Sequence, residues 1–125
     1  MAIKSRRLAP PHSQFHIADR SATGRDVPRE FSPDRQINAA SGYIIIGVLP
    51  DCDGPTTVSI GAADEIEPET ELACDRVLDT PTHIVRVFTT DRRTILVQSV
   101  PSGHTRVRIW VNDRKWADKV VIGLG

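Results

Sequence analysis

The fold is most strongly constrained by a succession of short runs rich in Val, Ile, Thr and aromatic residues, separated by turn residues. Tyr43–Leu49 is continuously apolar, as in a buried strand, and a turn-forming segment, PDCDGP, follows it at 50–55. The expected strands are residues 14–18, 43–49, 56–61, 69–79, 83–90, 94–100, 105–112 and 119–124. Strands spaced by about 8–12 residues are typical of a sandwich or barrel. We therefore expect a mainly-β protein, a single-domain antiparallel β-sandwich of seven or eight short strands.

The 125 residues suit a single domain. Residues 1–12 are basic and contain prolines, which predicts a loose N-terminal lead-in before a β-sandwich domain at 13–125. One short helix is expected at about Pro33–Ala40, because Ser32 can cap its first turn and Gly42 can end it. The last three expected strands have short connections, which favour a meander of hairpins.

The segment VPSGHTRVRIWVND, residues 100–113, predicts a turn followed by a strand with two different faces. The inward face holds Val107, Ile109 and Val111, and the other face holds Arg106, Arg108 and Trp110. Arg and Trp are common anchors of protein interfaces, so the second face is a candidate partner-binding surface. The alternative is structural: the tryptophan packs in the second layer of the sandwich and the arginine stems cover its edge.

The charge is balanced overall but unevenly distributed along the chain. A formal net charge of zero disfavours direct nucleic-acid binding, which needs a basic surface. Residues 51–80 carry nine acidic side chains and a single basic one, Arg76. The acidic positions of the central stretch are Asp64, Glu65, Glu67, Glu69, Glu71 and Asp75. They form either an ordinary solvated loop or a surface that presents carboxylates to a basic site, such as the nucleic-acid cleft of a nuclease.

Catalytic, metal and cofactor motifs are not found. The sequence has no nucleophile elbow and no phosphate-binding loop. His12 and His16 have the spacing of a metal pair on a helix, but Phe15 and Ile17 favour extended backbone, in which side chains four residues apart are too distant to share an ion. We therefore expect no enzymatic activity, no metal and no cofactor.

Two further features bear on location. Cys52 and Cys74 indicate free thiols in a reducing cytoplasm, although a disulfide across residues 57–60 would be expected if the protein were secreted. No stretch reaches the roughly 18 apolar residues of a membrane helix, and the N-terminus lacks the pattern of a signal peptide. A cytoplasmic protein without membrane contact is expected.

The order of these motifs resembles a known family. The chain resembles the competence protein J family of DNA-entry nuclease inhibitors in the order of four features. These are HSQF at 12–15, a capped segment ending at Gly42-Tyr43, an apolar strand, and V-P-x-G-x-x-x-V-R-I-W at 100–110. The pattern is also similar to small bacterial proteins with a P-x-G-x-Y-R-V-R-V segment; this chain has His104-Thr105 after the turn glycine, where a tyrosine is usual. The resemblance implies a small cytoplasmic binding protein that inhibits a nuclease.

Two functions from different classes are expected. The first is a non-enzymatic protein-binding module, an inhibitor or immunity-type factor for a nuclease or toxin, which uses the acidic stretch and the Arg106, Arg108 and Trp110 face. The alternative is a small-ligand or carbohydrate-binding sandwich, whose lining would come from Trp110, Trp116, Tyr43 and Arg108. An exposed strand edge would also allow two copies to pair as a homodimer.

Overall fold

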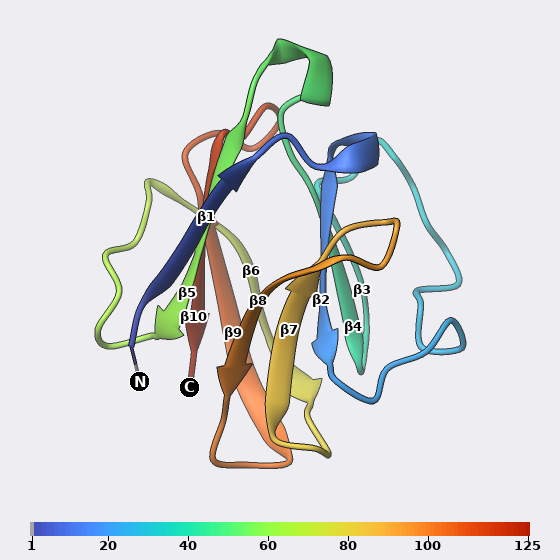
Figure 1. The fold of residues 1–125 in the computed structure, drawn as a ribbon, viewed down its shortest axis with the longest axis vertical. Helices are drawn as coiled ribbons and strands as arrows, with labels where there is room; N and C mark the ends of the chain where they lie inside the picture. The colour runs from blue at the N-terminus through green and yellow to red at the C-terminus, as the bar shows by residue number, and fades with distance from the viewer. Residues whose placement is uncertain (1) are drawn as a thin grey trace.

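The computed structural model describes residues 2–125 and consists of two five-stranded sheets that face each other (Figure 1). Sheet A contains, in spatial order, β1 (Lys4–Leu8), β5 (Thr56–Ala62), β10 (Lys119–Leu124), β9 (His104–Val111) and β6 (Glu71–Asp79). Sheet B contains β3 (Ile37–Ala40), β4 (Tyr43–Gly47), β2 (Gln14–Asp19), β7 (Ile84–Phe88) and β8 (Thr94–Ser99). The predicted mainly-β sandwich is confirmed, with ten strands among the described residues.

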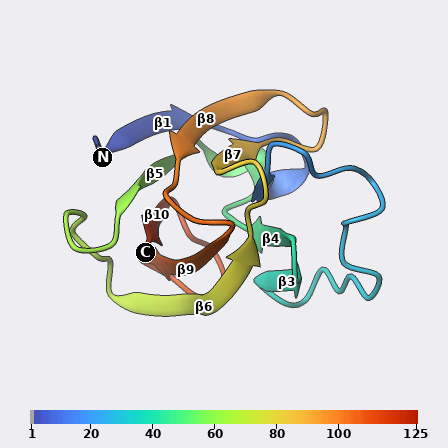
Figure 2. The same ribbon diagram turned by 90° about the horizontal axis from the view of Figure 1, so that it is seen from below.

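The two sheets approach each other at one pair of edges. All neighbouring strands are antiparallel except β5 and β10, which are parallel. Figure 2 shows β1 of sheet A beside β8 of sheet B, and the Lys4 Nζ atom donates a hydrogen bond of 2.6 Å to the Val97 carbonyl there. On the other side of the sandwich the edge strands are β6 and β3, and the Asp79 N–H at the end of β6 donates to the Ser41 carbonyl in the turn after β3 at 2.9 Å.

The core lies between the sheets and is built from side chains at alternating strand positions. Val107, Ile109 and Val111 are fully buried, which confirms the predicted inward face of this strand. Phe15 and Ile17 face them from sheet B and are also fully buried. Burying one such side chain stabilises the fold by about 1.5–3 kcal/mol, so this alternation fixes the register of each strand.

The expected helix at Pro33–Ala40 is not formed. Ile37–Ala40 is strand β3, and the preceding residues form a turn. Ser32 caps no helix: its backbone N–H donates to Asn38 Oδ1 at 2.9 Å. A helix of two turns is marginal by itself, whereas pairing with the buried strand β4 satisfies the backbone and buries apolar surface.

Two other expectations about chain connectivity are wrong. The residues expected to form a loose lead-in include strand β1, which pairs with β5 and adds a hydrogen bond of 2.6 Å between Ser5 Oγ and Ser59 Oγ. The last three strands do not form one meander. β7 and β8 form a hairpin in sheet B, and residues 100–103 then carry the chain across to β9 in sheet A. A short connection can cross between the layers because they are only about 10 Å apart.

Two short 3₁₀ segments, η1 (Pro11–Ser13) and η2 (Asp51–Asp53), complete the described elements. Cys52 is exposed on η2 and Cys74 is buried in β6, and both are free thiols. Within residues 2–125, no helix has the length and apolar character needed to cross a bilayer.

Candidate functional site

The predicted Arg and Trp face of β9 lies on the outer surface of sheet A. Trp110 is half-buried and packs over Gly123 of β10 instead of lying between the two sheets. The close packing depends on the glycine, since a Cβ atom at position 123 would lie 2.8 Å from Trp110 Cζ3. Neither sequence interpretation fits fully: the indole faces outward but rests on the sheet.

The two arginines beside the indole hold defined hydrogen bonds. Arg106 donates through Nε and Nη2 to the two carboxylate oxygens of Asp75, at 2.9 and 2.8 Å. The hydrogen bonds from Arg106 lower the pKa of the Asp75 carboxyl. Arg108 donates to the Gly125 carbonyl at 2.8 Å, and its guanidinium carbon lies 5.7 Å from the centre of the Trp110 ring. The arginine therefore forms a cation–π contact with the indole.

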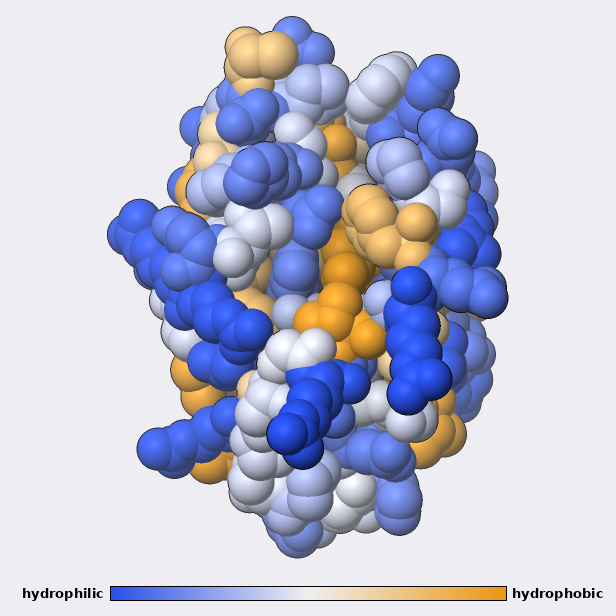
Figure 3. All heavy atoms as spheres, turned by 90° about the vertical axis from the view of Figure 1, so that its right-hand side faces the viewer, coloured by the Kyte–Doolittle hydropathy of each residue, from blue (hydrophilic) through white to orange (hydrophobic). Residues whose placement is uncertain are grey.

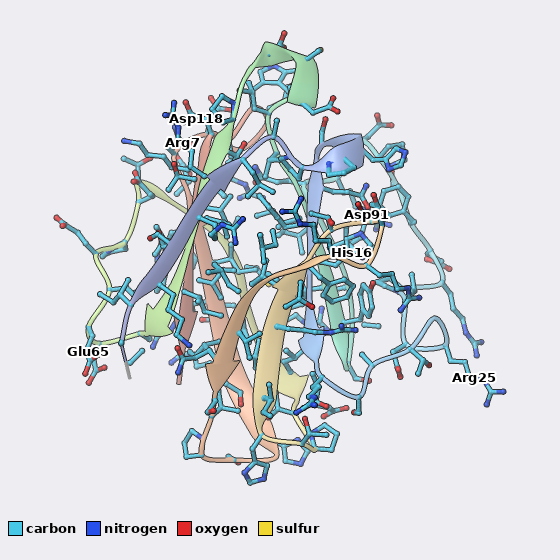
Figure 4. All side chains as sticks on the ribbon, in the orientation of Figure 1. Arg7, His16, Arg25, Glu65, Asp91 and Asp118 are labelled. Carbon is cyan, nitrogen blue, oxygen red and sulfur yellow. The ribbon has the colours of Figure 1, made fainter. Side chains whose placement is uncertain are left out.

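The acidic stretch is an ordered loop between β5 and β6. Its single buried side chain is Ile66, whose N–H donates to the Ala62 carbonyl at 3.1 Å. Ile66 anchors the loop on sheet A, because a Cβ atom at Gly61 or Gly123 would lie 3.0 Å or less from its side chain. Glu65 points away from the body of the protein (Figure 4). The exposed carboxylates are Asp64, Glu65, Glu67 and Glu71, and Glu69 is half-buried.

The fold brings the two predicted sets of residues together on one surface. β6 pairs with β9, which places Leu72 opposite Trp110 and Asp75 opposite Arg108. Leu72 and Val77 of β6 are 47% and 56% exposed and add apolar area. We call this surface the sheet A face. It is defined by Asp64, Glu65, Glu67, Glu69, Leu72, Val77, Arg106, Arg108 and Trp110. Glu71, the first residue of β6, is opposite the inward-facing Val111, so its exposed side chain lies on the other face of the strand.

The charge of the sheet A face is uncompensated at its acidic end. Within residues 2–125, Asp75 forms an ion pair with Arg106 and Asp79 lies 3.2 Å from His104, so the four carboxylates of the loop, Asp64, Glu65, Glu67 and Glu69, form no ion pair. The surface therefore combines a half-buried indole, exposed aliphatic side chains and free negative charge. Such a combination is suited to a partner that presents a basic surface around an apolar contact.

The lining expected for a carbohydrate or small ligand is not assembled. Tyr43 is buried on sheet B, whereas Trp110 and Arg108 lie on the outer face of sheet A. Trp116 is in the loop between β9 and β10. The proposed four-residue site is therefore wrong, because these side chains belong to different sheets and loops.

An aromatic cluster on the outer face of sheet B has a structural role. His16 Nδ1 is 2.5 Å from the Tyr43 hydroxyl, and Nε2 is 2.7 Å from Gln14 Oε1. Burial, together with the positive charge of Arg92, lowers the pKa of His16 to about 4.

Residues 2–125 contain no group of three or more His, Cys, Asp or Glu side chains that could hold a metal ion.

Sequence reasoning missed a groove of about 650 Å³ at the side of the protein away from the acidic loop. It lies between residues 31–36 and the loop from β9 to β10, and its lining includes Phe31 and Trp116. Figure 3 shows this side of the molecule, where a strip of hydrophobic residues lies between hydrophilic ones. The signal that could have revealed it is an aromatic residue within each of two charged loops, FSPDRQ and DRKWAD.

The fold matches two solved structures along nearly the whole chain. No protein-family model matches the sequence, and no curated protein matches it. The crystal structure of ComJ from Bacillus subtilis, described as an inhibitor of the DNA-degrading activity of NucA, has a TM-score of 0.69 and 14% identity, with 99% of this chain and 98% of that chain covered. The structure described as Crocagin biosynthetic gene J has a TM-score of 0.59 and 16% sequence identity, and the match covers 99% of this chain and 97% of that chain. At these identities the likeness concerns the fold, and the chain has the fold of ComJ.

Proposed function

We propose that this chain is a non-enzymatic, cytoplasmic protein-binding module that inhibits a nuclease through its sheet A face. The acidic loop, Asp64 to Glu69, would meet the basic surface that a nuclease uses for DNA, and Trp110 with Leu72 would supply the apolar contact. The two free thiols are consistent with a reducing compartment.

One observation carries this proposal: four carboxylates without ion-pair partners in residues 2–125 are held in an anchored loop beside an indole that has an arginine over its ring. Ordering the loop in advance reduces the entropy lost on binding. The anchor is Ile66, which is buried against Gly123. The fold shared with ComJ, an inhibitor of a DNA-degrading activity, favours a nuclease among the basic partners.

The first experiment identifies the partner and measures inhibition. The purified chain is immobilised, exposed to lysate of its source organism, and the retained proteins are identified by mass spectrometry. The captured nuclease is then purified and its DNA cleavage followed as the chain is added. We expect cleavage to fall until one equivalent is bound. The proposal fails if no nuclease is retained or if cleavage by the captured enzyme is unaffected.

The second experiment assigns the contact with matched charge reversals. Glu65→Lys/Glu67→Lys reverses two charges on the loop, and Asp51→Lys/Asp53→Lys reverses two exposed charges on η2, at the opposite end of β5. We expect the loop variant to slow association about tenfold at low salt. The difference should shrink toward 1 M salt, where the Debye length is about 3 Å. Equal association rates for the two variants would exclude the loop as the contact.

A further inference from the structure

A groove lies on the side of the protein opposite the acidic loop. In Figures 1 and 2 the β5–β6 loop and residues 20–36 lie at opposite sides of the sandwich. The groove beside residues 31–36 has an aliphatic part formed by Ile45 and Val48 and a wall from the β9–β10 loop. Its volume, about 650 Å³, is within the range of about 300–1,000 Å³ typical of binding pockets.

The walls of the groove are held in place by buried and bridging amides. Asn38 is 4% exposed and accepts a hydrogen bond from the Ser32 N–H while donating to the carbonyls of Ser32 and Arg35. Gln36 connects the two walls, since it donates to the Asp113 carbonyl and accepts from Arg114 Nε, both at 2.9 Å. These hydrogen bonds within the chain therefore fix the walls of the groove relative to each other.

The positive charge of the groove is not neutralised within the described chain. Arg35, Arg114 and Lys115 line it, and none forms an ion pair within residues 2–125. The hydrogen bonds of Arg35 and Arg114 go to neutral groups, the Glu30 carbonyl and the Gln36 amide. Asp34 is the only acidic residue of this lining, so the groove attracts anions.

Two large aromatic side chains stand at the same groove. Phe31 is 46% exposed and Trp116 is 51% exposed, and both line it. The Lys115 ammonium lies 5.1 Å from the Trp116 ring centre, so cation and aromatic face are presented together. One exposed aromatic residue is unremarkable, but two at one basic groove indicate a contact surface.

The groove continues along the free edge of sheet B. A second hollow of about 320 Å³ shares Arg35 and Asn38 with the groove, and its other charged residues are Arg29, Arg76 and Glu30. It runs beside β3, which pairs with β4 on one side and, within residues 2–125, with no strand on the other. An unpaired strand edge can accept the backbone of an extended peptide.

We propose that this groove binds an acidic, extended peptide segment of a partner protein. Carboxylates of the segment would pair with Arg35, Arg114 and Lys115, and an apolar side chain would lie between Phe31 and Trp116. A nucleic acid is disfavoured, because the whole chain has zero net charge and a strongly acidic loop. The proposal does not depend on the nuclease or on the sheet A face.

The test uses the full chain and a display library of random peptides. We expect the enriched peptides to carry several Asp or Glu residues around an apolar one. Arg114→Glu/Lys115→Glu should weaken their binding at least about tenfold. The matched control, Arg6→Glu/Arg7→Glu, reverses two exposed charges on β1 and should bind like wild type. Thermal unfolding verifies that each variant is folded.

A second variant protects the test against a folding defect, since Arg114 is bonded to Gln36. Trp116→Ala removes an exposed ring and should also weaken binding, while the backbone N–H of Trp116 can still donate to Asp113 Oδ1. Failure to enrich peptides, enrichment without acidic bias, or unchanged binding by both variants would overturn the proposal. If single-stranded DNA binds the wild-type chain and not the variants, the ligand of the groove is a nucleic acid and the peptide proposal is wrong. If sedimentation shows that the wild-type chain self-associates and the variants do not, the groove binds a second copy of this chain and the peptide proposal is wrong.

Discussion

Replacing Gly123 by alanine tests whether the acidic loop and the indole are joined through one close contact. The new Cβ atom would lie 2.8 Å from Trp110 Cζ3, 2.9 Å from Ile66 Cδ1 and 3.2 Å from Ala63 Cα. The end of the Ile66 side chain can turn away, but the indole and the backbone at Ala63 must shift. We therefore expect the substitution to displace both the tryptophan and the loop from sheet A.

The magnitude follows from two opposing effects. Overpacking costs about 1–3 kcal/mol, so about 2 kcal/mol is a fair value for a contact with one ring and one backbone atom. Replacing glycine by alanine also restricts the unfolded chain and returns about 0.5 kcal/mol. The free energy of unfolding of Gly123→Ala should therefore decrease by about 1.5 kcal/mol, which lowers the melting temperature by about 6 °C at this chain length.

Urea denaturation followed by tryptophan fluorescence measures this change. Gly103→Ala is the matched control, because a Cβ atom there meets nothing within 4 Å, and it should leave stability unchanged or slightly raised. Limited proteolysis at the glutamates of the acidic loop should accelerate only in Gly123→Ala. The reasoning is refuted if the two variants unfold at the same urea concentration and are cleaved at the same rate.

Two other predictions concern pH and the groove wall. The pKa of His16 is about 4 in the folded protein and about 6.5 in the unfolded chain. Between pH 4 and pH 6.5 the folded His16 is therefore mostly neutral, and the unfolded chain binds more protons than the folded one. Unfolding free energy should thus fall by on the order of 2 kcal/mol from pH 6.5 to pH 4, and urea titrations should show a flatter dependence in His16→Gln; an identical slope would contradict the assignment. Asn38→Ala should destabilise the protein by about 1–3 kcal/mol, because it leaves the backbone N–H of Ser32 and the carbonyl of Arg35 without their partner. Trypsin cleavage after Arg35 should accelerate, and unchanged cleavage would show that the wall does not depend on Asn38.

The strands that could be predicted are those whose own side chains alternate or are continuously apolar. Val107, Ile109 and Val111 are buried as expected, because the period of two places them on one face whichever strand lies beside them. The strand at Lys4–Leu8 could not be found in this way, since four of its five residues are exposed and it is held by its edge pairing with β5. The helix at Pro33–Ala40 was wrong for a related reason: capping signals are local, and pairing with β4 outweighs them.

The candidate site was foreseen in its residues but not in its assembly. The acidic stretch and the Arg106 to Trp110 face are separate in sequence; β6–β9 pairing places Asp75 beside this face, and the packing of Ile66 on Gly123 brings the acidic loop to it. The groove with Phe31 and Trp116 was not foreseen, because its walls come from two loops joined by Gln36.

The sequence by itself determined the class of fold, the inward faces of the strongest strands and the distribution of charge. These depend on local side-chain pattern, which is the same in any arrangement of the strands. Only the tertiary structure decided which strands are neighbours, that Trp110 rests on Gly123 beside the acidic loop, and that a basic groove opens on the opposite side. Such features depend on contacts between residues far apart in the chain, whose geometry no local pattern contains.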